Sequence, residues 1–342
     1  MNQVRIIAEA GVNHNGDANR ALAMVDAAAA AGADMVKFQT FTAKTLVSAN
    51  APKADYQINA TDADSQYAML RRLEIDRDVH VALMKRCAAR GIAFLSSPFD
   101  LTSLDMLADL KLTCLKIPSG EIDNLPYLRR AAGLFREIIL STGMATLGEI
   151  EAALRILTDT GISLDDIVVL HCTTEYPAPL TDVNLRAMET LRRAFGVRVG
   201  YSDHTSGIEV AVAAVALGAE IIEKHFTLNK MLPGPDHQAS LDPSELAALV
   251  AAVANVTAAL GSPVKAPAAS ELRNRPVVRK GIKAGRAIAA GEPFSADNLV
   301  VLRPQTGLSP LAWDILIGRP APRDFAAGEP IGLDMPCVPS AS

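Results

Sequence analysis

The sequence predicts an α/β protein built on a TIM (β/α)8 barrel, followed by a small β-rich C-terminal domain. Eight short apolar runs alternate with amphipathic segments over about 260 residues, and a TIM barrel typically takes about 250. The runs are continuously apolar rather than alternating, which is typical of parallel strands covered by helices. After Leu260 the composition changes, because Pro, Gly and short β runs replace the long helical patterns.

The predicted strands are short runs rich in β-branched and aliphatic residues. They are expected at 4–11, 34–40, 92–99, 112–119, 137–143, 166–173, 197–203 and 219–226. Helices are expected at 18–31, 76–90, 101–110, 147–160, 184–195, 208–217 and 244–260. The last of these helices begins after an N-cap residue, Asp242, with a proline at its first position. The stretch 41–77 is long for one connection, so we expect a lid loop over the barrel mouth within it.

Three parts are expected along the chain: a barrel domain at 1–262, a linker at 263–280 and a small C-terminal domain at 281–342. The linker is rich in Pro, Ala and charged residues. In the C-terminal part, the run Ala-Ala-Gly-Glu-Pro at 289–293 returns at 326–330. This repeat predicts a pseudo-symmetric, loop-rich β fold, and the alternative is a chance similarity between two turns.

Charge and cysteine usage exclude several classes of protein. The chain has 33 Lys and Arg against 38 Asp and Glu and shows no basic stripe, which argues against a nucleic-acid partner. Its four cysteines are scattered without a CxxC pair, which suits a reducing cytoplasm better than a disulfide framework or zinc ribbon. Glu9 interrupts the first apolar run, and Asn255 and Thr257 interrupt the longest one. We therefore expect a cytoplasmic protein with neither a signal peptide nor a membrane span.

Polar residues follow nearly every predicted strand, at the barrel end where catalytic groups lie. Lys37 and Lys116 lie inside apolar strands, and burying an unpaired ammonium is costly, so each needs an anionic partner. That partner is either a structural carboxylate or a bound anion. Four serines lie at the same strand ends: Ser97, Ser119, Ser141 and Ser202. Together with the lysines they predict a cradle for a phosphate or carboxylate group.

Two of the six histidines, His204 and His225, end the seventh and eighth predicted strands. Neighbouring parallel strands lie about 4.8 Å apart, so both imidazoles can reach one ion. Two histidines with nearby carboxylates suit a divalent metal such as Mn²⁺ or Fe²⁺. The nearby carboxylates are Glu9, Glu223 and Asp236. The alternative is a pair of structural histidines with no ligand.

The segment 231–237, Met-Leu-Pro-Gly-Pro-Asp-His, follows the eighth predicted strand. Its two prolines stiffen a Gly turn, which predicts that Asp236 and His237 lie over the barrel mouth. The alternative is an ordinary surface loop. His80 lies on a helical pattern and is expected to take no part in the site.

Several motifs, in order along the chain, resemble those of the sialic acid synthase family. The N-terminal motif is Ile-Ala-Glu-Ala-Gly-Val-Asn-His-Asn-Gly at 7–16, and the last two are Arg-Pro at 303–304 and Gly-Leu-Ser-Pro at 307–310. The others lie at 36–40, 116–121, 140–144, 202–205, 223–226 and 234–237. The resemblance covers essentially the whole chain. It implies a TIM barrel with a C-terminal SAF domain, which is similar to type III antifreeze proteins.

The resemblance also implies an activity. Family members condense phosphoenolpyruvate with an open-chain N-acylated amino sugar, giving a nine-carbon 2-keto acid and phosphate. They need a divalent metal, usually Mn²⁺, with Mg²⁺ or Co²⁺ as alternatives, and they form domain-swapped homodimers in which the SAF domain covers the partner's site. N-acetylmannosamine and 2,4-diacetamido-2,4,6-trideoxymannose both stay open as the acceptor, giving N-acetylneuraminate or N,N'-diacetyllegionaminate. Pseudaminate synthesis is a further alternative.

The resemblance assigns roles by position. His204 and His225 match the metal-binding histidines, and Glu9 matches the acidic residue beside the metal, a candidate base. The positions that hold phosphoenolpyruvate match Lys37, Ser97, Lys116, Ser119, Ser141 and Ser202. The sugar-side positions match Gln39, Tyr176 and Asp236, and Arg303 matches the SAF arginine that reaches the N-acyl group across the dimer. Thr174 lies where some members have Asn, which leaves its substrate contact less well defined.

Two other classes of protein compete with this interpretation. A related barrel that condenses phosphoenolpyruvate with phosphorylated sugars needs a second basic cluster, which the sequence does not show. A non-catalytic binding protein built on the SAF module would leave the barrel rim dispensable. Polar residues at all eight predicted strand ends argue against that second class.

Overall fold

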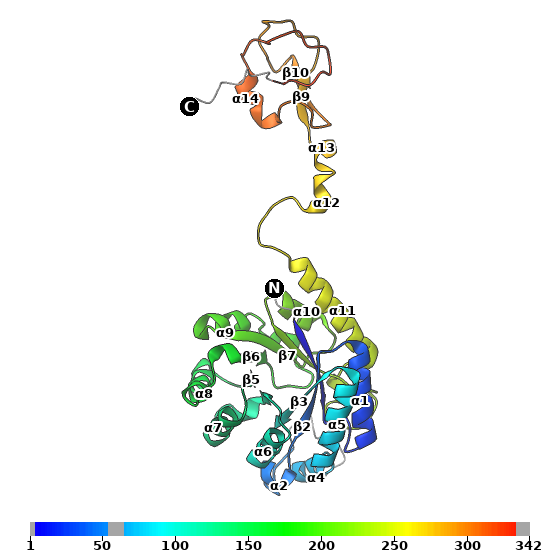
Figure 1. Ribbon diagram of the computed structural model, residues 1–342, viewed down its shortest axis with the longest axis vertical. Coiled ribbons are helices and arrows are strands. Elements are labelled where there is room, and N and C mark those ends of the chain that lie inside the picture. Colours follow the sequence, from blue (N-terminus) through cyan, green and yellow to red (C-terminus); the bar gives the residue numbers. More distant parts are fainter. Residues whose placement is uncertain (1–3, 54–64, 333–342) are drawn as a thin grey trace. The chain divides into compact units, whose positions relative to one another are not determined.

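The computed structural model describes residues 4–53 and 65–332 (Figure 1). The chain divides into two compact units, Met1–Gly261 and Ser262–Ser342. In the first unit, eight strands form one sheet in the order β3-β2-β1-β8-β7-β6-β5-β4. Within the described residues no hydrogen-bonded ladder joins β3 to β4, although the two strands lie side by side. The sheet is therefore a nearly closed parallel barrel.

The eight observed strands lie inside the eight predicted ranges, so the predicted TIM barrel is confirmed. They are β1 (Arg5–Gly11), β2 (Met35–Thr40), β3 (Ala93–Pro98), β4 (Cys114–Ile117), β5 (Glu137–Ser141), β6 (Ile167–Cys172), β7 (Arg198–Asp203) and β8 (Ile221–His225). Because side chains alternate along a strand, every second residue points into the barrel. The strand register therefore decides which side chains meet there.

The predicted helices are also present, with ends that differ by at most three residues. They are α1 (Ala18–Ala31), α5 (Arg77–Arg90), α6 (Leu101–Asp109), α8 (Leu147–Asp159), α9 (Ala187–Phe195), α10 (Glu209–Ala216) and α11 (Pro243–Leu260). The sequence interpretation missed α7 (Leu125–Leu134), which begins at the N-cap Asn124 with a proline in its first turn. In the stretch 41–77 the structure describes α2 (Ala43–Leu46) and α4 (Gln66–Arg71). The centre of the predicted lid loop lies outside the described residues.

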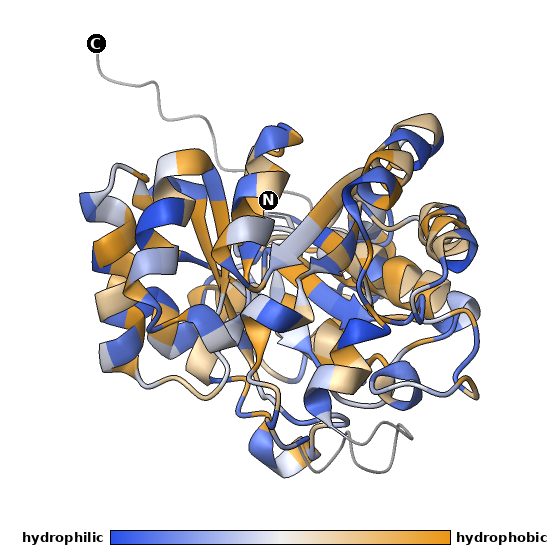
Figure 2. Ribbon diagram, turned by 90° about the horizontal axis from the view of Figure 1, so that it is seen from below, coloured by the Kyte–Doolittle hydropathy of each residue, from blue (hydrophilic) through white to orange (hydrophobic). Residues whose placement is uncertain are grey.

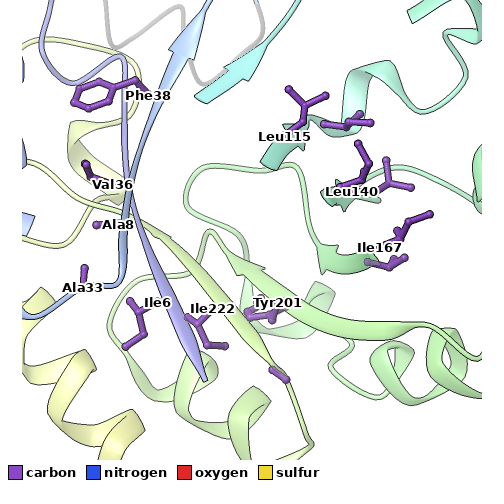
Figure 3. Packing of buried hydrophobic residues seen from close by; sticks show 14 of the residues in the cluster. Ile6, Ala8, Ala33, Val36, Phe38, Leu115, Leu140, Ile167, Tyr201 and Ile222 are labelled. Atoms are coloured by element: carbon purple, nitrogen blue, oxygen red, sulfur yellow. The ribbon is translucent and has the colours of Figure 1, made fainter. Parts of the chain in front are cut away.

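The barrel has two apolar cores, one on each face of the sheet. The larger core lies between the strands and the surrounding helices, and Figure 3 shows part of it, including Ile6, Ile222 and Tyr201. The helices combine hydrophobic and hydrophilic residues along their length (Figure 2), as expected for helices with one buried face. The smaller core fills the barrel interior with Ile7, Leu95, Ile139, Val168, Leu170 and Ile221.

Helix α11 corrects one sequence-based expectation. By length and composition alone it is long and apolar enough to cross a membrane, although Asn255 and Thr257 had argued otherwise. In the barrel this helix packs beside α1 and α10, and it buries Leu246, Leu249 and Val253. The test considers length and composition only, and 17% of this helix is buried in the structure.

The second unit has its own small core, formed by Ile282, Phe294, Leu299, Phe325 and Ile331 with their neighbours. Its regular elements are short: β9 (Gly281–Ala284), β10 (Leu299–Leu302) and α14 (Trp313–Leu316). The predicted linker contains two single-turn helices, α12 (Ala269–Leu272) and α13 (Arg275–Val278), which the sequence interpretation did not expect.

The two copies of the sequence repeat in the second unit make matching contacts in the structure. Ile288 and Phe325 exchange both backbone hydrogen bonds, at 2.9 and 2.8 Å. Gly291 donates to the carbonyl of Ala321, and Gly328 donates to that of Ala284, so the two copies make equivalent contacts. The glutamates of the repeat also match, because Glu292 pairs with Arg286 and Glu329 pairs with Arg323, each at 2.7 Å. These reciprocal contacts support the pseudo-symmetric fold over a chance similarity.

Candidate active site

A cavity of about 430 Å³ lies at the carboxyl ends of the barrel strands. It is lined by all thirteen of the predicted site residues that belong to the barrel. They are Glu9, Lys37, Gln39, Ser97, Lys116, Ser119, Ser141, Thr174, Tyr176, Ser202, His204, His225 and Asp236. These residues come from every strand or the loop that follows it, so only the closed barrel brings them together.

Two lysines and two glutamates form the floor of the cavity. Lys37 Nζ lies 2.8 Å from Glu9 Oε2 and 3.7 Å from Glu223 Oε1. Lys116 Nζ lies 3.6 Å from the same Glu223 oxygen. All four side chains are almost fully buried. The anionic partners required by the lysines are therefore present in the protein itself, with Glu223 shared between both.

The charges on this floor are set by burial and by mutual attraction. Burial acts to lower the pKa of Lys37, but Glu223 and Glu9 outweigh it and the pKa of Lys37 rises. For Lys116 burial prevails, and its pKa is lowered. Burial raises the pKa of Glu9, which makes this carboxyl group a better proton acceptor. The pKa of Glu223 is lowered, because Lys116 and Lys37 outweigh the effect of its burial.

Hydroxyl groups surround the two ammonium groups. Lys37 Nζ donates to Ser97 Oγ at 3.1 Å, and Lys116 Nζ donates to Ser141 Oγ at 2.6 Å. Ser119 Oγ accepts a hydrogen bond from the backbone N–H of Gly143 at 2.9 Å. Ammonium and hydroxyl donors in one pocket are what a phosphate or carboxylate group requires.

Gly143 has no room for a larger side chain. A Cβ at this position would collide with the hydroxyl of Thr174 and would lie 3.0 Å from Ser119 Oγ and 3.1 Å from Cys172 Sγ. The turn after β5 therefore packs directly against the turn after β6. This close approach brings Ser119 and Thr174 to the same wall of the cavity.

His204 and His225 lie side by side at the ends of β7 and β8, with ring centroids 5.5 Å apart. His204 Nδ1 lies 2.6 Å from the carbonyl oxygen of Thr173, which can only accept, so Nδ1 carries the hydrogen. Burial lowers the pKa of His204 to about 4, so the ring is neutral and Nε2 keeps its lone pair. This is the tautomer that a metal-binding histidine adopts.

His225 is also neutral. Burial, with the neighbouring His204, lowers its pKa well below the usual value. Its Nδ1 has no hydrogen-bond partner in the described part of the chain and lies 3.7 Å from Asp236 Oδ2. No trio of His, Cys, Asp and Glu side chains among the described residues is close enough to hold a metal by itself. Two imidazoles by themselves are an incomplete set of metal ligands.

Asp236, Glu9 and Gln39 converge on Gly11 at the cavity wall. Gln39 Nε2 donates to Glu9 Oε1 at 3.2 Å. A Cβ at Gly11 would lie 3.2 to 3.6 Å from atoms of all three side chains, and its φ of 52° also favours glycine. Burial, followed by the proximity of Glu9, raises the pKa of Asp236 to about 7.

The loop that carries Asp236 is fastened to the loop after β1. Asn13 Nδ2 donates to the carbonyl of Phe226 and to Ser240 Oγ, both at 2.9 Å. Ser240 Oγ in turn donates to the backbone carbonyl of Asp236 at 2.6 Å. Asp236 therefore lies over the cavity, as predicted.

His237 corrects the same prediction, because it turns away from the cavity. Its Nδ1 lies 2.7 Å from Thr227 Oγ1, and its Nε2 lies 3.3 Å from Asn15 Oδ1. The remaining histidines also lie elsewhere. His80 bonds Thr40 and the carbonyl of Asp76, as expected for a residue outside the site. Among the histidines that the structure describes, His204 and His225 alone line the cavity.

One wall of the cavity is formed by an aromatic ring packed on the two histidines, and another is apolar. The ring of Tyr176 lies 4.2 Å from that of His204 and 5.6 Å from that of His225, measured between centroids. The segment between β2 and α5 supplies an apolar wall that the sequence interpretation did not specify. It consists of Phe41, Leu46, Val47, Met69, Leu70 and Leu73.

Glu223 is the residue that the sequence interpretation undervalued. It was noted as a nearby carboxylate, yet it was given no role. Its position two residues before His225 places both on the same face of β8, and this spacing was the available signal. Ser202 Oγ donates to Glu223 Oε1 at 3.1 Å, so the carboxylate lies among Ser202, Lys37 and Lys116.

Arg303 lies in the second unit, directly after β10, and is exposed. Its backbone carbonyl accepts a hydrogen bond from Lys283 Nζ at 3.2 Å. Its predicted role depends on a partner subunit and stays a prediction.

The fold and the cavity together define a class of protein: a (β/α)8 barrel in which two buried lysines, surrounded by hydroxyl groups, lie beside two neutral histidines. The particular family follows from comparison with known proteins. The model of the NeuB family matches residues 24–265, and that of the SAF domain matches residues 279–335. This chain belongs to the NeuB family.

Named relatives match along nearly the whole chain. The N,N'-diacetyllegionaminic acid synthase of Campylobacter jejuni is 50% identical, with 96% of this chain and 99% of the relative covered. The enzyme of the same name from Legionella pneumophila is 47% identical, with coverages of 94% and 92%. A pseudaminic acid synthase of Campylobacter jejuni is 35% identical over 96% of this chain and 95% of its own length.

A solved structure supports the fold. The N-acetylneuraminic acid (sialic acid) synthetase of Leptospira borgpetersenii, in complex with citrate, matches with a TM-score of 0.69. It is 38% identical, and the match covers 80% of this chain and 90% of that chain.

Proposed function

We propose that this chain is a nonulosonic acid synthase that condenses phosphoenolpyruvate with an open-chain N-acetylated amino sugar. One observation supports this above all: two buried, hydroxyl-ringed lysines lie in the same cavity as two neutral, neighbouring histidines. Phosphoenolpyruvate carries a phosphate and a carboxylate, which matches two cationic subsites. The membership of the NeuB family agrees with this activity.

In the proposed reaction, the enol carbon of phosphoenolpyruvate forms a bond to the aldehyde carbon of the sugar. Water adds to the carbon that bears the phosphate, the bond between that carbon and the phosphate oxygen breaks, and inorganic phosphate leaves. Lys37, Lys116 and the serines hold the anionic groups in place during these steps. Glu9, whose pKa burial raises, is placed to accept the proton of the attacking water.

His204 and His225 would hold a divalent metal, for which we propose Mn²⁺, with Mg²⁺ or Co²⁺ as alternatives. Such an ion would polarise the aldehyde oxygen of the sugar as a Lewis acid. The fixed tautomer of His204 and the unpaired Nδ1 of His225 support this assignment. Asp236, Gln39 and Tyr176 lie around the same part of the cavity and are proposed to orient the sugar.

For the acceptor, we propose 2,4-diacetamido-2,4,6-trideoxymannose, which gives N,N'-diacetyllegionaminate. The two relatives at 50% and 47% identity bear the name of that product. The apolar wall formed by Phe41, Met69 and Leu70 suits the additional acetyl group and the 6-methyl group. Lys37 and Lys116 are the only Lys or Arg residues among the described residues that line the cavity, which favours a sugar without a phosphate group.

One assay tests the function and the acceptor together. The protein is incubated with phosphoenolpyruvate, Mn²⁺ and either N-acetylmannosamine or the diacetamido-trideoxy sugar, and phosphate release is measured. We expect release with both sugars and a higher kcat/KM with the diacetamido sugar. Absence of release with either sugar would refute the synthase assignment. A higher kcat/KM with N-acetylmannosamine would refute only the choice of acceptor.

We further propose a domain-swapped homodimer, in which Arg303 of one subunit reaches the sugar in the barrel of its partner. An Arg303→Ala variant should raise the KM for the sugar more than the KM for phosphoenolpyruvate, because the arginine is assigned to the N-acyl group. Mixing this variant with a Lys116→Met variant should restore part of the activity, since mixed dimers contain one intact site. Absence of any restored activity in the mixture would argue against sites completed across subunits.

We also propose that the enzyme works in the cytoplasm, in keeping with its cysteines. Cys87, Cys114 and Cys172 are free thiols, and burial raises the pKa of Cys87 and Cys114 to about 12. Thiols such as Cys87 and Cys114, whose pKa is raised in this way, are inert structural groups that suit a reducing compartment. Recovery of the protein in the membrane fraction of its source cells would contradict this proposal.

A further inference from the structure

Asp203 and Lys224 form an ion pair that the proposed reaction does not use. Lys224 Nζ lies 2.9 Å from Asp203 Oδ2, and neither side chain is exposed to solvent. The two residues are direct partners in the ladder between β7 and β8. Because their neighbours Ser202, His204 and His225 line the cavity, the ion pair lies on the opposite face of the sheet.

This ion pair holds the backbone on both sides of His204. Asp203 Oδ1 accepts hydrogen bonds from the backbone N–H of Thr205 at 2.9 Å and from its hydroxyl at 2.8 Å. Lys224 Nζ also donates to the backbone carbonyl of Thr205. One buried cluster thus joins the two residues that flank His204 to the residue that directly precedes His225.

Stability alone does not explain a buried ion pair at this position. Two apolar side chains of similar volume often stabilise a fold as well as a buried ion pair does, because both charges must be desolvated. Charge-assisted hydrogen bonds differ from apolar contacts in that they fix distances and directions. The Asp203–Lys224 pair therefore fixes the position of β7 relative to β8 where the two histidines lie.

We propose that Asp203 and Lys224 are positioning residues that set the separation of His204 and His225 for a shared divalent metal. The inference rests on the proposed function, since it takes the two histidines as the metal ligands. Outer-shell partners of this kind usually tune metal affinity rather than bind the metal themselves. Here the pair acts through the backbone of β7 and β8.

The chain supplies a matched control for this inference. Arg198 and Glu220 join the same two strands near their other ends, with Arg198 Nε 2.8 Å from Glu220 Oε2. Both side chains are about one-third exposed, at 35%. Removing this second ion pair perturbs the contact between β7 and β8 without touching the residues around the histidines.

The test is a titration of the full-length protein with Mn²⁺. Electron paramagnetic resonance measures the concentration of free Mn²⁺ at each step, which gives the Kd. The variants are Asp203→Asn/Lys224→Met, which removes both charges together, and Arg198→Met/Glu220→Gln as the control. We expect the first variant to raise the Kd for Mn²⁺ about 10-fold or more. Its affinity for phosphoenolpyruvate, measured by calorimetry without metal, should not change, and the control should match the unmodified protein in both measurements.

The possible outcomes separate this inference from the proposed function. A lower Tm with an unchanged Kd for Mn²⁺ in the Asp203→Asn/Lys224→Met variant would show a purely structural role and overturn the inference alone. Absence of Mn²⁺ binding to the unmodified protein would overturn the metal assignment, and this inference with it. If the double variant does not fold, the Asp203→Glu variant, which keeps both charges but lengthens the side chain, gives the same readout, and an unchanged Kd there overturns the inference.

Discussion

The interior of the barrel presents two different surfaces on the same strands. Near the amino ends of the strands the inward side chains are apolar, as with Ile7, Leu95, Ile139, Leu170 and Ile221. Two residues further along, the same strands present Glu9, Ser97, Ser141, Cys172 and Glu223 to the cavity. On each of these strands, consecutive inward-pointing residues therefore belong first to the apolar core and then to the cavity.

The difference shows how the barrel separates stability from function. The apolar layer removes hydrocarbon surface from water, which stabilises the fold. The polar layer buries Lys37, Lys116, Glu9 and Glu223, and burying charges opposes folding unless each is paired. Pairing within the layer keeps these groups in place for a ligand. Mutations in the polar layer should therefore lower activity, and mutations in the apolar layer should lower the free energy of unfolding.

The largest loss of activity is expected from substitutions at the two histidines beside the polar layer. His204→Ala and His225→Ala should each abolish phosphate release and its stimulation by Mn²⁺, because each removes one of two proposed metal ligands. The measurement is phosphate release with and without Mn²⁺. His171→Asn is the matched control, since His171 lies outside the cavity and bonds the carbonyl of Val183 at 2.7 Å. A doubly substituted His204→Ala/His225→Ala protein that Mn²⁺ still stimulates would contradict the assignment.

The next prediction compares one residue of each layer. Lys116 belongs to the polar layer and Ile139 to the apolar layer, and the two are paired in the ladder between β4 and β5. Lys116→Met should lower kcat/KM for phosphoenolpyruvate by about 10²–10³, as for the loss of one preorganised electrostatic contact. Ile139→Ala should lower the free energy of unfolding by about 2–5 kcal/mol, because it leaves a cavity in the core.

Urea unfolding and steady-state kinetics of both variants check this contrast. The folded fraction of Ile139→Ala should keep the kcat/KM of the unmodified protein, and Lys116→Met should stay folded at the assay temperature. The comparison between the layers fails if Ile139→Ala loses activity while it remains fully folded.

The smallest effect concerns pH and His14, which follows β1. Burial lowers the pKa of His14 to about 4, against about 6.5 in an unfolded chain. As the pH falls from 6.5 to 4, the unfolded chain binds a proton that the folded protein does not, so stability is lost over this window. His14→Asn should remove this contribution, and its amide oxygen can replace Nδ1 as the acceptor for the N–H of Gly16.

Urea midpoints at pH 7.5 and pH 4.5 measure this effect. The unmodified protein should lose more stability between the two pH values than His14→Asn does. Taking the difference between the two proteins removes the contributions of the other buried histidines. An equal loss in both proteins would show that His14 does not contribute to acid unfolding.

Much of the fold could be predicted from local pattern. Each strand of the barrel is a largely apolar run, and each of the helices that were predicted has a clear cap or period, so their order along the chain followed from short-range signals. Helix α7 was missed because it has only ten residues and contains Gly133, which weakens the helical pattern. The long segment after β2 gave no signal for its apolar wall, because its side chains meet only over the closed barrel.

Part of the site could be predicted, because some of its residues are unusual for their place in the sequence. Lys37 and Lys116 stood out because a charge in an apolar strand is unusual, and the histidine pair stood out because adjacent strands end together. His237 has the same residue type and a similar place near the barrel mouth, yet it faces Thr227 and Asn15. Loop geometry, which local sequence does not encode strongly, decided that difference.

By itself, the sequence determined the eight-stranded barrel, its polar end and the family to which the chain belongs, because periodicity and ordered motifs are local properties. Only the tertiary structure decided which charges are partners. Glu223 lies between two lysines from distant strands, and Asp203 meets Lys224 behind the histidines. Both arrangements depend on the register and closure of the sheet, which bring residues far apart in the chain to within a few ångströms.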